Sequence, residues 1–155
     1  MKLWKIYERI VDHINFYSMP LFVPDASIIL AFFLQEQEKG EKAKEFFLEV
    51  RSGDYSIILP SIWFYEVGNK LGRSESVEAR KYRDLLCFYR EHFFPTIETD
   101  ESVTTLAFNL MGKYPSISFY DAIYHALAIN LKAIFLTADK RYFALTKKEG
   151  SIEYF

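Results

Sequence analysis

Four acidic side chains lie next to apolar segments, where a charge needs a specific partner. The first follows the apolar run in VPDAS, and the last follows another in FLTADKRYF. The other two lie among aromatic and aliphatic neighbours in PSIWFYEVGNKL and SISFYDAIYHALA. Carboxylates that lose water and repel one another are unstable unless something positive compensates them. These residues are Asp25, Glu66, Asp121 and Asp139.

A divalent cation would resolve this conflict. Hard oxygen ligands without a cysteine or histidine cluster suit Mg²⁺ or Mn²⁺, and Mg²⁺ commonly meets phosphate groups while it keeps several waters. Such an ion polarises a phosphodiester and converts bound water into a hydroxide nucleophile. The sequence therefore predicts a Mg²⁺ or Mn²⁺ site at which the four carboxylates converge within a few ångströms of a common centre.

Structural explanations compete with this interpretation. Asp25 and Asp139 both fit N-caps of the helices that follow them. Ser118 and Asp121 have the S-x-x-D form of a capping box. For any one residue the structural explanation is favoured, but four such residues at one edge of a sheet together favour a site.

Two further residues leave alternatives open. Glu66 fits an i,i+4 pair with Lys70 on a solvated helix face. His125 lies four residues after Asp121 and could share its helix face as a ligand or general base. A packed histidine is the more common outcome on a buried helix.

The elements that must position these acids alternate between strand and helix. Because most strands are short and apolar on both faces, we expect an α/β three-layer sandwich with a central, mainly parallel sheet of about five strands. Sites in such folds lie beyond the carboxyl ends of the strands. Residues 1–18 form an extra amphipathic helix before the first strand, and Met19 is an alternative start. Strands are expected at 21–24, 55–59, 93–97, 133–137 and 152–155, and helices at 26–34, about 40–51, 61–71, 76–92, after Asp100, at 119–130 and 140–147.

Composition limits the possible functions. The 155 residues carry a net charge of −2, which argues against nucleic-acid binding through a large basic surface. The single cysteine, Cys87, predicts a reducing compartment, and the chain lacks the roughly 20-residue apolar run of a membrane span. We therefore expect a soluble cytoplasmic protein of one domain.

VPDASIIL, LPSIWFYEVGNKL, SISFYDAIYHALA and FLTADKRYF occur in an order that resembles PIN-domain nucleases, most closely the toxin ribonucleases of VapBC toxin-antitoxin pairs. The resemblance covers about residues 19–155, which predicts a PIN-like nuclease domain after the helix of residues 1–18. It implies an endoribonuclease that uses metal-activated water, a homodimer and a cognate antitoxin. The family's four acids match Asp25, Glu66, Asp121 and Asp139, and its supporting polar positions match Ser27, Asn69 and Thr137.

RNA phosphates would be contacted by cations near the site, although an ordinary solvated surface explains these side chains equally well. They are Lys70, Arg73, Lys140 and Arg141.

Rival functions come from other classes. A haloacid-type phosphotransferase requires D-x-D after its first strand, whereas this chain has Asp25-Ala26-Ser27, and a receiver domain requires an acidic pair that is missing. A PIN-like binding module without catalysis remains open, as does a PIN nuclease of RNA processing that has no antitoxin. Retention of all four acids favours an enzyme.

Overall fold

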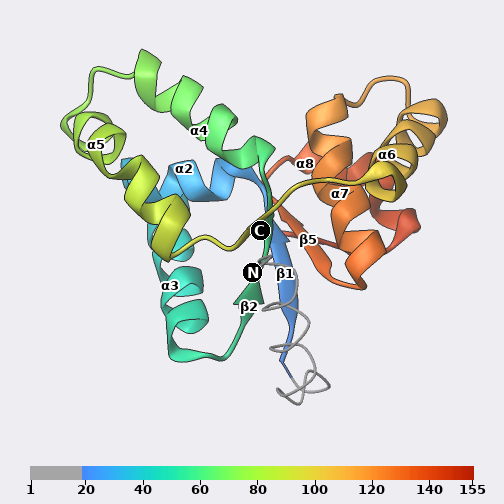
Figure 1. Cartoon of the computed structure of the whole chain (residues 1–155), viewed down its shortest axis with the longest axis horizontal. Helices are drawn as coiled ribbons and strands as arrows, with labels where there is room; N and C mark the ends of the chain where they lie inside the picture. The colour runs from blue at the N-terminus through green and yellow to red at the C-terminus, as the bar shows by residue number, and fades with distance from the viewer. Residues whose placement is uncertain (1–18) are drawn as a thin grey trace, which may run out of the picture.

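The computed structural model describes residues 19–155, so the helix expected over residues 1–18 lies outside the described part. A four-stranded parallel sheet in the order β2-β1-β5-β6 forms its centre. Figure 1 shows helices α2 to α5 on one side of this sheet and α6 to α8 on the other, which confirms the predicted α/β layers. The strands are β1 (Leu21–Pro24), β2 (Ser56–Ile57), β5 (Ile134–Thr137) and β6 (Ile152–Tyr154).

The single strand expected over residues 55–59 is divided between two sheets. The N–H of Ile58 donates to Phe22 of β1, whereas the N–H of Leu59 donates to Pro95. Backbone pairing therefore changes partner between two adjacent residues, and β3 (Leu59–Pro60) forms a separate parallel pair with β4 (Thr96–Ile97). The prediction of about five strands in one sheet becomes four strands plus a two-stranded sheet, because a continuous apolar run carries no signal for a change of partner.

The helices follow the predicted positions closely, and the main difference is an earlier start of α3. Short polar side chains cap most of them; for example, Ser76 accepts from the N–H of Ala79 and Asp100 accepts from the N–H of Val103, whereas α3 and α4 have no such side-chain cap. The helices are α2 (Ala26–Leu34), α3 (Gln37–Ser52), α4 (Ile62–Arg73), α5 (Val77–His92), α6 (Glu101–Lys113), α7 (Phe119–Leu131) and α8 (Lys140–Thr146), followed by the 3₁₀ turn η1 (Lys147–Glu149).

Helix α7 is buried as its apolar sequence predicts. Residues 122–128 are all buried, and the helix contacts both β1 and β5. In the sheet beneath it, Val23 of β1 and Phe135 of β5 are neighbours in register and have no exposed surface. The first turn of α7 is therefore fixed relative to the carboxyl ends of the two central strands. Within the described residues, no helix is long and apolar enough to cross a membrane.

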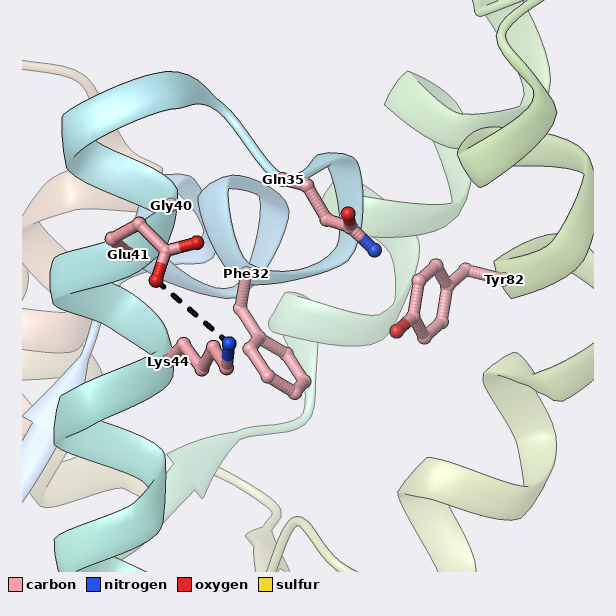
Figure 2. Close-up of a pocket in the computed structure, with 6 residues that line it drawn as sticks. All are labelled: Phe32, Gln35, Gly40, Glu41, Lys44 and Tyr82. Carbon is pink, nitrogen blue, oxygen red and sulfur yellow. Dashed lines mark ion pairs between the residues drawn. The ribbon is translucent and has the colours of Figure 1, made fainter.

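Close packing at Gly40 joins α2 to α3. A Cβ atom at this position would lie 2.8 Å from the carbonyl carbon of Gln35 and 3.1 Å from the carbonyl oxygen of Ala31. Figure 2 shows Gly40 beside a pocket that Phe32 and Tyr82 also line. The contact atoms are backbone, so they cannot move aside as a flexible side chain would.

Replacing Gly40 by alanine should therefore destabilise the fold by about 1–3 kcal/mol, as overpacking usually does. Gly112→Ala is the matched control, because this helical glycine has no atom within 4 Å of its expected Cβ position. That variant should be neutral or slightly more stable, since alanine favours helix. Chemical denaturation of both variants measures the difference, and equal stabilities would contradict the predicted clash.

Candidate active site

All four predicted carboxylates line one cleft, which has a volume of about 500 Å³. Each comes from a different element. Asp25 follows β1, Glu66 lies in α4, Asp121 lies in the first turn of α7, and Asp139 precedes α8. Segments that are 114 residues apart in sequence, from position 25 to position 139, thus meet at the carboxyl edge of the sheet. This is the edge at which parallel α/β folds place their sites.

Asp25 is the most strongly held of the four, with a side chain that is only 8% exposed. Its Oδ1 accepts hydrogen bonds from the backbone N–H groups of Ser27 and Ile28, at 2.8 and 3.2 Å, and from the Ser27 hydroxyl. Its Oδ2 accepts from the Thr137 hydroxyl at 2.7 Å and from the N–H of Ala138 at 3.3 Å. Asp25 is therefore an N-cap and a cleft carboxylate at once, so the two sequence interpretations are compatible.

Thr137 links two of the acids. While its hydroxyl donates to Asp25, its Oγ1 accepts the backbone N–H of Asp139 at 3.0 Å. Asp139 in turn caps α8, because its Oδ1 accepts from the N–H of Tyr142. One buried threonine at the end of β5 thus connects the acidic residues that follow the two central strands.

Glu66 is held by a tyrosine and not by Lys70. The Tyr124 hydroxyl donates to Glu66 Oε2 at 2.6 Å, and this bond joins α4 to α7. Burial raises the pKa of Glu66, an effect that the Tyr124 hydrogen bond opposes and that the negative charges of Asp121 and Asp25 reinforce. Glu66 therefore sits in a desolvated position, and the i,i+4 alternative with Lys70 is wrong.

Asp121 combines capping with a similar electrostatic position. Its N–H donates to the Ser118 hydroxyl oxygen at 3.1 Å, and the Ser118 hydroxyl lies 2.6 Å from Asp121 Oδ2 and donates to it. Burial raises the pKa of Asp121, the Ser118 hydrogen bond opposes this, and the charges of Asp25 and Asp139 raise it further. The Asp121 carboxylate is thus in electrostatic contact with two other acids of the cleft.

The other predicted residues divide into two groups. Ser27, Asn69 and Lys70 line the cleft, and Thr137 supports it from below through Asp25. Three predicted RNA-contacting cations do not line it. They are Arg73, Lys140 and Arg141.

His125 is a packed core histidine, as the structural alternative expects. It has no exposed surface, and its Nε2 donates to the Gly150 carbonyl oxygen at 2.7 Å. With that nitrogen protonated, Nδ1 accepts from the Tyr142 hydroxyl at 3.1 Å. Burial lowers the pKa of His125, so the imidazole is held neutral and takes no part in the cleft.

The donor set of the cleft fits a hard divalent cation. Four carboxylates with oxygen-bearing neighbours match Mg²⁺ or Mn²⁺. Burial raises the pKa of Glu66 and Asp121, the charges of neighbouring acids raise it further, and a bound cation would relieve both effects. In residues 19–155, no three acidic, histidine or cysteine side chains are grouped closely enough to hold an ion by themselves. The prediction that the four carboxylates converge within a few ångströms of a common centre is therefore wrong for this structure, although all four line the same cleft. Carboxylates that repel one another stand apart, and a Mg²⁺ ion that keeps several waters needs few direct protein ligands.

Sequence reasoning missed three tyrosines of the cleft. Tyr124 is almost fully buried and supports Glu66, while Tyr65 and Tyr120 are 63% and 53% exposed. Tyr124 follows Asp121 by three residues on the same helix, and this spacing was a usable signal. The exposure of Tyr65 and Tyr120 could not be seen without the fold, because both lie in aromatic-rich segments that also supply core residues.

Comparison with known proteins identifies the fold and the family. The family model described as PIN domain matches residues 22–149, which include all four acids. The chain belongs to the PIN domain family. PIN domains are generally nucleases that use divalent metal ions. A search of curated proteins found no match to the sequence.

Solved toxin-antitoxin structures share this PIN fold at low sequence identity. A toxin-antitoxin complex from Klebsiella pneumoniae aligns with a TM-score of 0.60 and 16% identity, over 86% of this chain and 95% of that chain. VapBC2 from Rickettsia felis, bound to a promoter DNA fragment, has a TM-score of 0.62 and 15% identity over 87% and 98%. VapBC-1 from nontypeable Haemophilus influenzae gives 0.61 and 13% over 87% and 96%. At these identities the likeness shows the fold alone.

Replacing Asp25 by asparagine should destabilise this PIN domain by about 1–3 kcal/mol, although asparagine caps isolated helices as well as aspartate does. Both oxygens of Asp25 accept backbone N–H groups, and an amide has one oxygen only. In one orientation, the N–H of Ala138 would face an amide N–H₂ group. Asp139→Asn is the matched control, since that side chain accepts one backbone N–H and can keep its cap. Chemical denaturation without divalent cations measures the free energy of unfolding of both variants. Equal losses of stability in Asp25→Asn and Asp139→Asn would contradict the prediction.

Stability without divalent cations should depend on Glu66 in a pH-dependent way. Because its folded pKa is raised above the ordinary 4.5, the folded protein retains a proton that the unfolded chain has already released. The contribution of protonated Glu66 to the free energy of unfolding is therefore fully present below pH 4.5, and it is lost as the pH rises through the folded pKa. Glu66→Gln removes the cost of ionising this partly buried carboxyl and keeps an oxygen that accepts from Tyr124. The variant should therefore be more stable than wild type at neutral pH.

The advantage of Glu66→Gln should shrink as the pH falls to 4.5 and below, where wild-type Glu66 is protonated. Glu45→Gln, at an exposed position outside the cleft, controls for the general loss of one negative charge. Thermal unfolding of the three proteins between acidic and neutral pH measures the effect. A stability difference that does not change with pH would refute the assigned electrostatic position of Glu66.

Proposed function

We propose that this PIN domain is a metal-dependent endoribonuclease and the toxin of a toxin-antitoxin pair. The observation that carries the proposal is the meeting of four carboxylates, from four separate elements, in one cleft of a chain that belongs to the PIN domain family. The toxin-antitoxin complexes that share its fold support the choice of biological role.

The chain's own residues would act mainly by position and charge. Asp25, Asp121 and Asp139 would hold Mg²⁺ or Mn²⁺, with Glu66 directly or through water. When bound, the cation supplies a Lewis acid for the scissile phosphate and an activated water. Five hydrogen bonds hold the Asp25 carboxylate in place, and the Tyr124 hydroxyl orients Glu66. Such preorganisation is what a cation-assisted displacement requires of its ligands.

A homodimer and an antitoxin are the proposed partners. The support for a dimer is apolar surface at the C-terminal end of α5, where Phe88 of the helix and Phe93 directly after it are 49% and 51% exposed with ring centroids 5.6 Å apart. Exposed aromatic pairs of this kind are typical of association surfaces. A net charge of −2 argues against nucleic-acid binding through a large basic surface and is compatible with a protein partner.

The alternative function is a PIN-like binding module without catalysis. It would retain the fold and bind nucleic acid or protein without using the acids. The Asp25 hydrogen bonds alone do not separate the two functions, because they also stabilise the fold. The raised pKa of Glu66 and of Asp121 favours the nuclease, since a pure scaffold gains nothing from gathering desolvated negative charges.

Replacing Asp121 by asparagine should reduce RNA cleavage by at least about 100-fold, because the carboxylate contributes to holding the cation that activates water. The fold should survive, since asparagine keeps an oxygen for Ser118. Thermal shift supplies a second readout, in which Mg²⁺ or Mn²⁺ raises the unfolding temperature of the wild type more than that of the variant. Asp84→Asn, an exposed aspartate outside the cleft, should match wild type in both assays. Cation binding by wild type without any RNA cleavage would instead support the binding module.

A further inference from the structure

The cleft has an electrostatic disadvantage as a binding site for RNA. Four carboxylates and one lysine, Lys70, are the charged side chains that line it. Nucleic-acid binders usually gain most of their affinity when lysine and arginine neutralise phosphates. A bound cation would attract the scissile phosphate, but among the described residues of the cleft only Lys70 could neutralise the phosphates of neighbouring nucleotides. Contacts other than phosphate contacts are therefore needed to hold the strand.

Two exposed tyrosines occupy the places where such contacts would form. Tyr65 directly precedes Glu66 on α4, and Tyr120 directly precedes Asp121 on α7. Both side chains line the cleft, with 63% and 53% of their surface exposed. Figure 1 shows α4 and α7 on either side of β1, so the two rings belong to different walls of the cleft.

The exposure of these rings is not explained by the stability of the fold. Tyr124 also lines the cleft, but it is 1% exposed and its hydroxyl supports Glu66. In contrast, the hydroxyls of Tyr65 and Tyr120 make no hydrogen bond within the part of the chain that the structure describes. Large side chains that contribute neither core packing nor hydrogen bonds at a cleft are available for a ligand.

We propose that Tyr65 and Tyr120 are stacking platforms for unpaired bases and so position the RNA strand in the cleft. This inference rests on the proposed nuclease function and names two residues that would hold its substrate. Stacking on an aromatic ring needs a free base face, which a duplex covers and a single strand offers. Because every base has such a face, the contact favours single strands with little dependence on sequence. It also works without positive charge, which suits an acidic cleft.

The test measures binding separately from cleavage. Fluorescence anisotropy with Mg²⁺ would follow the binding of labelled 12-nucleotide single-stranded RNA to the Asp121→Asn variant. The same variant would then carry in addition Tyr65→Ala, Tyr120→Ala, Tyr65→Trp or Tyr120→Trp. The second probe is an abasic strand of the same length, which keeps the phosphates but has no bases, and the third is the corresponding duplex. Tyr154→Ala is the matched control, since Tyr154 is 48% exposed and lies outside the cleft.

Each alanine variant should bind base-bearing single strands about 5- to 100-fold more weakly, as loss of one stacked base predicts. The tryptophan variants and Tyr154→Ala should retain binding, and the abasic strand and the duplex should bind weakly to all the proteins. In the otherwise wild-type enzyme, the alanine variants should raise KM more than they lower kcat. Such a split is expected of a binding residue and not of a general structural one.

Two results would overturn the inference while leaving the nuclease intact. The first is an alanine variant that binds base-bearing and abasic strands as its parent does, and the second is an equal loss for both strands. A changed sedimentation coefficient for Tyr65→Ala or Tyr120→Ala would assign the ring to a protein interface and would also overturn it. Failure of the proposed function is distinct, because the otherwise wild-type enzyme would then cleave no RNA at all.

Discussion

The hydrogen bond from Thr137 to Asp25 is the contact on which the organisation of the cleft depends. It joins the carboxyl ends of β1 and β5, which are adjacent and parallel, and it fixes the carboxylate from which α2 begins. The same threonine accepts the backbone N–H of Asp139 and so determines where α8 starts. Two strand ends, two helix starts and two acids are thereby placed by one buried side chain. A slip in strand register would break all of these relations together.

That arrangement brings four negative charges into one cleft, in which Asp25 is buried, Glu66 and Asp121 are half-buried and Asp139 is exposed. The fold tolerates it because most acids also have a local structural role: Asp25 and Asp139 cap helices, and Asp121 bonds Ser118. The structural role of these residues is therefore compatible with their proposed catalytic role. These hydrogen bonds fix the three aspartate carboxylates in place. Burial and, to a smaller extent, the charges of Asp25 and Asp139 raise the pKa of Asp121, and both favour binding of a cation.

Much of this was predictable from the sequence. Apolar runs ending in acidic residues located β1 and β5, the nearly uniform apolarity of α7 predicted its burial, and polar caps marked the starts of α5 and α6. The split between β2 and β3 was not predictable, because the change of hydrogen-bond partner at Ile58 depends on strands distant in sequence. For the same reason, the sequence offered only Lys70, four residues away, as an alternative partner of Glu66, whereas its hydrogen bond comes from Tyr124, 58 residues away. Local spacing describes helices well but does not detect contacts between them.

The position of Glu66 explains why it needs that distant partner. Asp25 and Asp139 are N-caps and Asp121 lies in a first turn, so each is near the partial positive charge of a helix N-terminus. Glu66 is the fifth residue of α4, beyond the reach of that helix's free N–H groups. A carboxylate there must obtain its hydrogen bond from another element, and the hydroxyl of buried Tyr124 provides it. Helix α7 thus supports the cleft twice, through Asp121 at its start and through Tyr124 one turn later.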